Sequence, residues 1–338
     1  MIVTFGEIMM RLAPPGYLRL VQTNSLEMTF GGGEANVAVS LANYGKKARF
    51  VTKLPDNDLG RACMGELKKF DVDTSKIALG GDRIGIYYCE KGASQRASKV
   101  IYDRANSAIA KATADDFDWD DIFKGAEWFH FTGITPALGD NVAEITKIAC
   151  QKAKERGIKI SCDLNFRKKL WTREKAKEVM TELMQYVDVL IANEEDSADV
   201  FGITADKTDI TKGEIDRDGY VSVAKKLCDT FHFEKVAITL RESVSASCNH
   251  WSALLYNGKE AIFSKKYTMQ IVDRVGGGDS FGAGLIYGIT ENMSDKDTLE
   301  FAVAASCLKH SVEGDFNMVS VAEVKALSGG DGSGRVQR

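Results

Sequence analysis

Residues 275–284, "VGGGDSFGAG", place three consecutive glycines directly before Asp279. Phe281, Leu285 and Ile289 follow at four-residue spacing, which predicts one face of a helix that begins near this aspartate. Glycines at a helix N-terminus allow backbone N–H groups to converge on an anion, and the helix adds its partial positive charge there. The stretch therefore predicts a site for a transferring phosphoryl group, with Asp279 placed to accept the proton of an attacking hydroxyl. A flexible turn with an ordinary capping aspartate is the alternative.

The same letters also spell G-x-S-x-G over residues 278–282, the turn that presents a serine nucleophile in α/β-hydrolases. Ser280 would then be the nucleophile, residues 30–33 would mimic an oxyanion loop, and His310 would be the base. Such a turn follows a buried strand, whereas two charged residues stand shortly before these glycines. The apolar period around His310 also predicts a helix rather than a loop. We therefore interpret Asp279 as the working residue and keep the serine hydrolase as a remote alternative.

The composition is that of an ordinary globular protein. The chain has 338 residues, 44% of them apolar and 27% charged, with a formal net charge of −4. This balance gives no reason to expect nucleic acid or a membrane surface as a partner. No run approaches the ~18 apolar residues of a membrane span, and we expect a cytoplasmic protein. The seven cysteines have no C-x-x-C spacing and the four histidines lie far apart, so neither a zinc site nor a disulfide framework is indicated.

Short apolar runs that favour strands alternate with stretches of helical period. Helices are expected over residues 34–44, 142–156 and 174–186, between runs such as "IVTFGE", "EWFHFTG" and "VDVLIAN". This alternation predicts an α/β fold with a doubly wound, mostly parallel sheet and helices on both of its faces. Near the end, "ALLYNGKEAIFS" predicts a hairpin that turns at Asn257 and Gly258.

Two segments interrupt the alternation and predict a small β-sheet lid. Residues 84–104 read as two extended runs around a Gly-Ala-Ser turn, which favours an antiparallel hairpin, and residues 11–30 lack a helical period. An exposed lid edge could pair with another subunit, so a homodimer or larger homo-oligomer is expected. We predict one domain over residues 1–327, a surface excursion at 204–216 and a disordered tail at 328–338.

Three motifs carry a family resemblance. "DRVGGGDSFGAG", residues 273–284, resembles the C-terminal signature of the ribokinase-like (PfkB) carbohydrate kinases. "FGGGEANVAVSLANYG", residues 30–45, is similar to their N-terminal signature, with Asn36 at its asparagine position. "NEED", residues 193–196, resembles their N-x-x-E motif. The motifs stand in the family order over about residues 1–327, so the resemblance implies a doubly wound α/β domain with a β-lid.

The resemblance implies an ATP-dependent kinase that uses Mg²⁺. It implies Asp279 as the catalytic base, beside a phosphoryl group held by the N–H groups of Gly276, Gly277 and Gly278. Asp196 would lie near the magnesium ion. The nucleotide is expected to contact Asn193, Thr239 and Arg241 together with Gly276 and Gly278. Whether a monovalent cation takes part stays open.

Two further segments are similar to those of the 2-keto-3-deoxygluconate kinases of this family, namely "DLNFRKKLW" at residues 163–171 and "VIYDRANSA" at 100–108. Guanidinium groups bind carboxylates bidentately, so a sugar acid is the implied substrate. Fructokinases share the first segment, and a fructokinase or another sugar kinase stays the alternative. Ordinary surface ion pairs are the alternative for the two arginines. The implied substrate residues are Gly32, Tyr87, Tyr102, Arg104 and Arg167.

The chain departs from the family pattern mainly near the expected nucleotide. Arg241 and Val244 stand where members usually have glycine, and Arg274 replaces a small residue of the C-terminal signature. Asp196 replaces the glutamate of N-x-x-E, and Glu34 replaces a small residue of the N-terminal signature. The contacts of the nucleotide loop are therefore expected to differ from those of the family.

Overall fold

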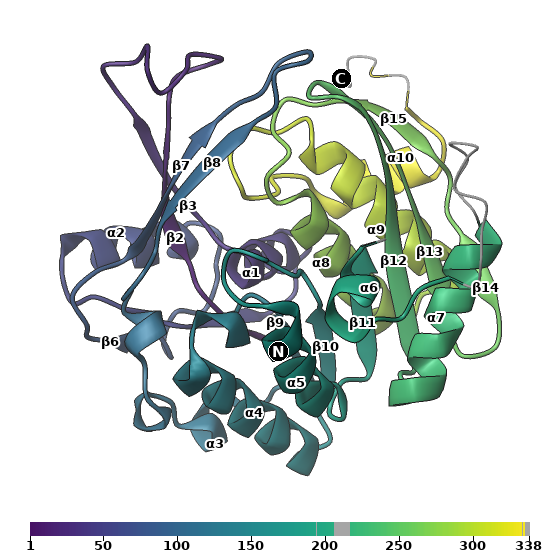
Figure 1. Ribbon diagram of the computed structural model, residues 1–338, viewed down its shortest axis with the longest axis horizontal. Helices are drawn as coiled ribbons and strands as arrows, with labels where there is room; N and C mark the ends of the chain where they lie inside the picture. The colour runs from purple at the N-terminus through teal and green to yellow at the C-terminus, as the bar shows by residue number, and fades with distance from the viewer. Residues whose placement is uncertain (194, 206–216, 333, 335–338) are drawn as a thin grey trace.

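Six adjacent parallel strands make up most of the main sheet in the computed structural model, which describes residues 1–193, 195–205, 217–332 and 334 (Figure 1). Within these residues the sheet has nine strands in the order β14-β13-β12-β11-β10-β9-β1-β4, and β15 pairs with β13. The parallel strands are nearly continuous apolar runs because helices cover both of their faces. They are β1 (Ile2–Phe5), β4 (Ala48–Val51), β9 (Trp128–Thr132), β10 (Lys159–Asp163), β11 (Val189–Asn193) and β12 (Lys235–Ser245), and the antiparallel ones are β13 (Cys248–Tyr256), β14 (Ala261–Phe263) and β15 (Tyr267–Gln270).

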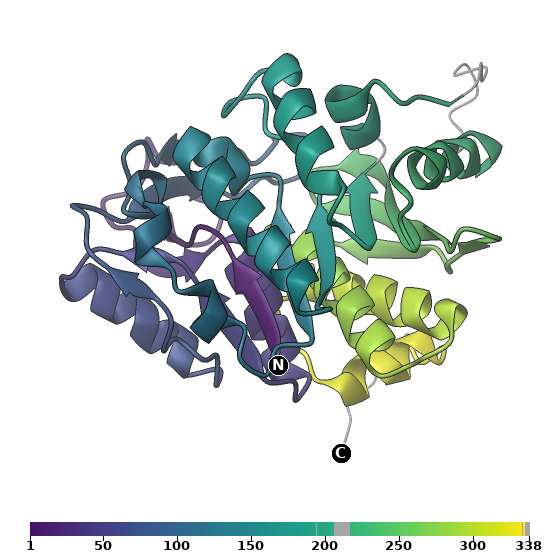
Figure 2. The ribbon, with the colours of Figure 1, turned by 90° about the horizontal axis from the view of Figure 1, so that it is seen from below.

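Alternate residues of one strand enter two different hydrophobic cores. On β11, Val189 and Ile191 join the core on one face, whereas Leu190 and Ala192 join the core on the other. Figure 2 shows both layers, with the yellow-green helices on one side of the sheet and the teal helices on the opposite side. The first layer holds α1 (Gly33–Asn43), α2 (Asp58–Lys68), α8 (Gly277–Thr290), α9 (Asp295–Lys309) and α10 (Val321–Ser328), and the second holds α3 (Trp119–Ile122), α4 (Asp140–Glu155), α5 (Arg173–Met184), α6 (Asp196–Phe201) and α7 (Arg217–Phe231).

A separate sheet of four strands forms the lid, in the order β3-β2-β7-β8 (Figure 1). The predicted hairpin is present, since β7 and β8 pair antiparallel with Tyr87 opposite Tyr102. The lid strands are β2 (Met9–Ala13), β3 (Glu27–Gly31), β7 (Gly85–Glu90) and β8 (Lys99–Asp103). The connections hold the short pair β5 (Lys53–Leu54) and β6 (Ala78–Leu79) and the 3₁₀ turns η1 (Ile109–Lys111), η2 (Ala114–Asp116) and η3 (Pro136–Leu138).

The doubly wound α/β fold and its β-lid are thus confirmed, and element ends differ from the prediction by a few residues. The main shift concerns α8, which begins at Gly277, so Asp279 lies inside its first turn. Helix α10 ends at Ser328, and the predicted excursion and tail fall largely on residues 206–216, 333 and 335–338, outside the described residues. Among the described helices, none is long and apolar enough to cross a membrane.

Candidate active site

One cleft of about 400 Å³ lies between the lid and the main sheet. Its walls come from the lid, from the carboxyl ends of the central strands and from the start of α8. The structure brings every predicted site residue to this cleft. They are Gly32, Tyr87, Tyr102, Arg104, Arg167, Asn193, Asp196, Thr239, Arg241, Gly276, Gly277, Gly278 and Asp279.

The three glycines at the start of α8 differ in how strictly the structure requires a glycine at their position. Gly276 has φ +83°, and a Cβ there would overlap the carbonyl oxygen of Asp315. A Cβ on Gly277 would overlap the His310 ring, whereas nothing lies within 4 Å of the corresponding position on Gly278. Among the described residues, the N–H groups of Gly278 and Asp279 have no acceptor, as expected for the first turn of a helix. Backbone donors at this turn are therefore available to an anion.

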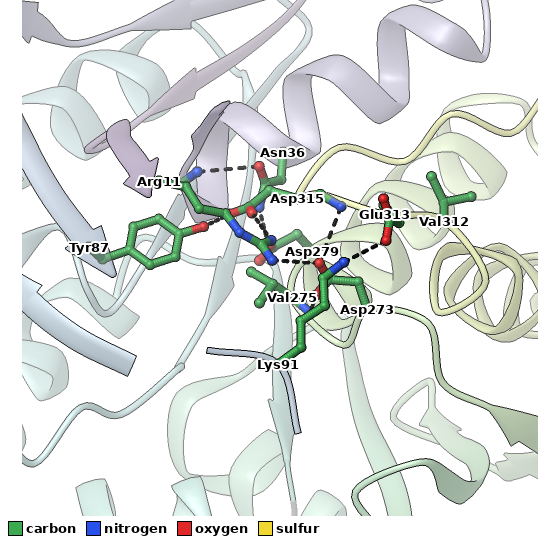
Figure 3. Close-up of polar contacts among 12 residues, drawn as sticks. Arg11, Asn36, Tyr87, Lys91, Asp273, Val275, Asp279, Val312, Glu313 and Asp315 are labelled. Atoms are coloured by element: carbon green, nitrogen blue, oxygen red, sulfur yellow. Dashed lines mark hydrogen bonds and ion pairs between the residues drawn. The ribbon is translucent and has the colours of Figure 1, made fainter. Parts of the chain in front are cut away.

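Asp279 is held by the N-terminal helix. Asn36 on α1 donates from Nδ2 to Oδ2 of Asp279 at 2.7 Å, and its own Oδ1 accepts the N–H of Gly32 at 3.3 Å (Figure 3). Burial raises the pKa of Asp279 to about 6, although the hydrogen bond from Asn36 opposes the rise. The nearby carboxyl group of Asp315 raises this pKa further, and the cation of Arg167 lowers it. At neutral pH the group is thus a carboxylate with a proton affinity close to the ambient pH, as a general base requires.

The serine hydrolase alternative is wrong. Ser280 is 1% exposed, does not line the cleft, and its Oγ has no hydrogen-bond partner among the described residues. The proposed base, His310, is engaged through Nδ1 with the carbonyl oxygen of Ser306 at 2.7 Å. Burial lowers the pKa of His310 to about 4, so the ring is a neutral packing element beneath α8.

The lid contributes polar groups on one wall of the cleft. The hydroxyl of Tyr87 donates to Oδ2 of Asp315 at 2.5 Å, and Tyr102 is 41% exposed. Arg104 forms an ion pair with Glu7, with Nε donating to Oε2 at 2.8 Å, and this pair is buried at the cleft rather than an ordinary surface pair. Arg167 is different, because it is exposed and forms no ion pair with any described residue. Its guanidinium is available to an anionic ligand.

Two carboxylates lie across the cleft from the lid. The carboxylate of Asp196 accepts hydrogen bonds from the N–H groups of Phe166 and Asn193, each at 3.2 Å. In turn, Oδ1 of Asn193 accepts a hydrogen bond from the N–H of Asp196. Burial raises the pKa of Asp163, and the charges of Asp196 and Asp279 raise it further. No group of three or more metal-ligating side chains occurs in the described part of the chain. Magnesium usually needs only one or two carboxylates plus phosphate oxygens, so mutually repelling carboxylates fit such a cation.

The comparisons with known proteins agree with this geometry. The family model described as "pfkB family carbohydrate kinase" matches residues 1–321. The chain belongs to this family. It is therefore a sugar kinase, a phosphotransferase with a ribokinase-like fold, and the resemblance read from the three motifs is confirmed.

Relatives of the kinase cover nearly its whole length. The crystal structure of 2-dehydro-3-deoxygluconokinase from Thermotoga maritima is 51% identical, with a TM-score of 0.94 over 97% of this chain and 98% of that one. The 2-dehydro-3-deoxygalactonokinase of Haloferax volcanii is 35% identical over 331 residues, 98% of this chain and 97% of the relative. A protein called ribokinase II from E. coli, solved with ATP and Mg²⁺, shares the fold at 18% identity and a TM-score of 0.79, over 96% and 97% of the two chains.

Sequence reasoning missed a buried charge network beside the cleft of the kinase. Arg11 on lid strand β2 donates from Nη1 to Oδ1 of Asp315 at 2.7 Å and from Nη2 to Oδ2 of Asp273 at 2.6 Å (Figure 3). Lys309 is fully buried nearby, and its Nζ donates to the carbonyl oxygen of Val312 at 3.1 Å. The available signal was a lone arginine inside the apolar run "MMRLA". A charge at that position needs buried partners.

Proposed function

We propose that the kinase transfers the γ-phosphoryl group of ATP to the terminal hydroxyl of 2-keto-3-deoxygluconate, which is the compound also called 2-dehydro-3-deoxygluconate. The observation that carries this proposal is the convergence of Asp279, the free N–H groups of α8 and the unpaired Arg167 on one cleft. The names of the Thermotoga and Haloferax relatives support a 2-keto-3-deoxy sugar acid. Fructose or another neutral sugar is the alternative substrate.

In this proposal Asp279 is the general base. Asn36 occupies Oδ2, which leaves Oδ1 to accept the proton of the attacking hydroxyl. Gly276, Gly277 and Gly278 shape the turn that holds the transferring phosphoryl group. The N–H of Gly277 already donates to the carbonyl oxygen of Arg274 at 3.4 Å, so the donors proposed for the phosphoryl oxygens are the N–H groups of Gly276, Gly278 and Asp279. Donors fixed in this way need no rearrangement when charge builds up on those oxygens.

The lid and the loop after β10, which carries Arg167, would together bind the sugar acid. Arg167 forms the ion pair with its carboxylate, and Arg104 adds the N–H groups that its pair with Glu7 leaves free. The hydroxyl groups of the sugar would bond to Tyr87, Tyr102 and the backbone of Gly32. Closure of the lid over the ligand would exclude water from the phosphoryl group and limit wasteful hydrolysis of ATP.

ATP and Mg²⁺ would occupy the opposite wall, in keeping with the ligands of the E. coli protein. We assign nucleotide contacts to Asn193, Thr239 and Arg241 along with Gly276 and Gly278. Asp196 would hold the magnesium ion, which neutralises the phosphate charge when bound. Participation of a monovalent cation remains a prediction, and it is tested by comparing turnover in potassium chloride with turnover in choline chloride.

The decisive experiment measures ADP release from Mg–ATP with a panel of sugars and sugar acids. We expect 2-keto-3-deoxygluconate to stimulate turnover, and its C4 epimer 2-keto-3-deoxygalactonate tests the preference suggested by the two relatives. Asp279→Asn should lose at least ~100-fold in kcat, and Ser280→Ala should retain activity. The proposal fails if no sugar acid stimulates ADP release, and faster turnover with fructose would favour a fructokinase.

We also propose that the lid forms a subunit interface. Its outer surface exposes large apolar side chains, and β3 and β8 are open edges of the lid sheet. A second copy of the chain would cover both features. Light scattering should then report a dimer or larger oligomer that Val21→Asp weakens, and a monomer at all concentrations would refute this. The exposed residues are Tyr17, Leu18, Val21, Leu26, Met28 and Ile101.

A further inference from the structure

Two arginines line the cleft near the glycine turn, and neither forms an ion pair with a described residue. Arg241 lies on β12, opposite Trp251 of β13, and its side chain is exposed. Arg274 stands two residues before Gly276, in the loop that leads into α8. The buried Arg11, in contrast, has two carboxylate partners. An unpaired arginine pair inside a cleft therefore needs an explanation.

Arg274 is fixed in place by neutral groups only. Its Nη2 donates to the carbonyl oxygen of Ala246 at 2.9 Å, in the turn between β12 and β13. Its Nε is buried and has no hydrogen-bond partner among the described residues. A buried donor without an acceptor is costly, and a charged one more so. The guanidinium is thus held in a defined orientation with unused donor capacity.

The two arginines also repel each other. Burial lowers the pKa of Arg274, and the positive charge of Arg241 lowers it further. The carboxylate of Asp273 raises this pKa, but it is already bonded to Arg11. Arg241 and Arg274 likewise help to lower the pKa of the neighbouring His310. This part of the cleft therefore carries an excess of positive charge that a polyanion would neutralise.

The position of Arg274 in the chain connects the pair to the expected phosphoryl site. Arg274 lies in the loop that ends at Gly276 and leads into the first turn of α8, where the transferring phosphoryl group is expected. Of the groups that would bind the sugar acid, Tyr87 and Tyr102 belong to the lid strands β7 and β8. The free donors of α8 line the same cleft as the arginine pair, so an anion held by the pair can extend from the phosphoryl site.

We propose that Arg241 and Arg274 form a clamp for the β- and γ-phosphates of the nucleotide. The assignment rests on the proposed ATP-dependent function and adds Arg274 to its binding residues. Planar guanidinium groups bind phosphate oxygens bidentately, and two of them can share the charge that passes to the leaving β-phosphate during transfer. In this chain the clamp supplies contacts from side chains that replace small residues of the family pattern.

The experiment measures nucleotide binding by calorimetry, with Mg²⁺ and without sugar. The ligands are ATP, ADP and AMP, and the variants are Arg241→Gln, Arg274→Gln and Arg274→Lys. We expect each glutamine variant to lose roughly 10- to 100-fold in affinity for ATP, with AMP bound as by the wild type. The affinity of Arg274→Lys for ATP should lie between those of Arg274→Gln and the wild type, because lysine keeps the positive charge but lacks the planar guanidinium group. Arg61→Gln on α2 removes a solvent-exposed arginine of the same charge and should change nothing.

The possible outcomes distinguish a phosphate clamp from a contact to the nucleoside or to the sugar-acid carboxylate. An unchanged ATP affinity in Arg241→Gln, an exposed position at which folding is not at risk, overturns the clamp. A loss for AMP as large as that for ATP also overturns it, because the pair would then support the nucleoside wall. If Arg241→Gln and Arg274→Gln both bind ATP as the wild type does, but the KM of the sugar acid rises, the arginine pair binds the carboxylate of the sugar acid instead. Phosphate-dependent losses in a protein that turns over no sugar would refute the proposed function and leave the clamp standing.

Discussion

Removal of the Asn36 side chain amide should move the acid limb of the pH–rate profile upward. Asn36→Ala deletes the 2.7 Å hydrogen bond to the carboxylate of Asp279. That bond favours the ionised form, so its loss raises a pKa that burial has already raised to about 6. Hydrogen bonds to charged groups contribute about 1.5–3 kcal/mol, which corresponds to roughly 1–2 pKa units. Since Asp279 is only half-buried, water can replace part of the bond, and we expect about 1 unit.

The assay is kcat/KM for the sugar substrate between pH 5 and 9 at saturating Mg–ATP. The base works as a carboxylate, so activity falls as pH drops through its pKa, and the variant should be roughly fivefold slower at pH 6 but nearly equal to wild type at pH 8. Asn43→Ala is the matched control, because this residue of the same helix bonds to the carbonyl oxygen of Asn317 instead. A uniform loss at every pH, or a limb that moves downward, would refute the role of Asp279 as base.

Five further substitutions test the contacts around the cleft. Arg11→Met leaves two buried carboxylates without their cation and should lower the free energy of unfolding by about 3–5 kcal/mol in urea titrations, and a loss below about 1 kcal/mol would show that the network is not coupled. Gly277→Ala places a methyl group on an imidazole ring and should lower the melting temperature, whereas Gly278→Ala meets open space and should melt like the wild type. Tyr102→Phe removes an exposed hydroxyl and should raise the KM of the sugar acid with unchanged stability, whereas Tyr87→Phe breaks a buried hydrogen bond and should both raise the KM and lower the stability.

The layered fold was predictable because its strands and helices differ in apolar period. Alternation of short apolar runs with helical stretches predicted the parallel sheet, and the lack of helical period predicted the lid. Element ends were less predictable. The apolar period marks only the buried face of α8, whereas its start is set by Gly276, whose left-handed backbone turns the chain into the helix. The polar residues of β12 and β13 beyond Arg241 likewise carry no strand pattern, since they form a hairpin that extends past the core.

The candidate site was predictable where its residues stand in short motifs. The glycine turn, Asp279 and Asn36 are local signals, and the cleft confirms that they lie together. The charge network could not be predicted, because Arg11 and Asp315 are 304 residues apart and the sequence around one gives no information about the other. A single charged residue in an apolar strand indicates only that it has a buried partner of opposite charge. Which carboxylate supplies it depends on how the lid strand β2 passes over the loop after α9.

The contacts of the lid converge on the loop that carries the glycine turn. Arg11 bonds to Asp273, whose Oδ1 accepts the N–H of Val275 at 3.1 Å, so a lid strand is tied to the residue before Gly276. At its far end, the lid hairpin rests on the turn between β12 and β13, where the N–H of Ala246 donates to the carbonyl oxygen of Ser94 at 2.8 Å.

Arg274 bonds to the other side of the same turn, through the carbonyl oxygen of Ala246. The lid is therefore linked to the loop before α8 at two separate points, one through buried charges and one through the β12–β13 turn. Movement of the lid away from the sheet would strip Asp273 of its cation and free the turn that positions Arg274. Because hydrogen bonds and charged pairs inside a protein strengthen one another, we expect the position of the lid and the geometry of the glycine turn to be coupled. A substitution on the lid side should consequently alter nucleotide binding as well as sugar binding.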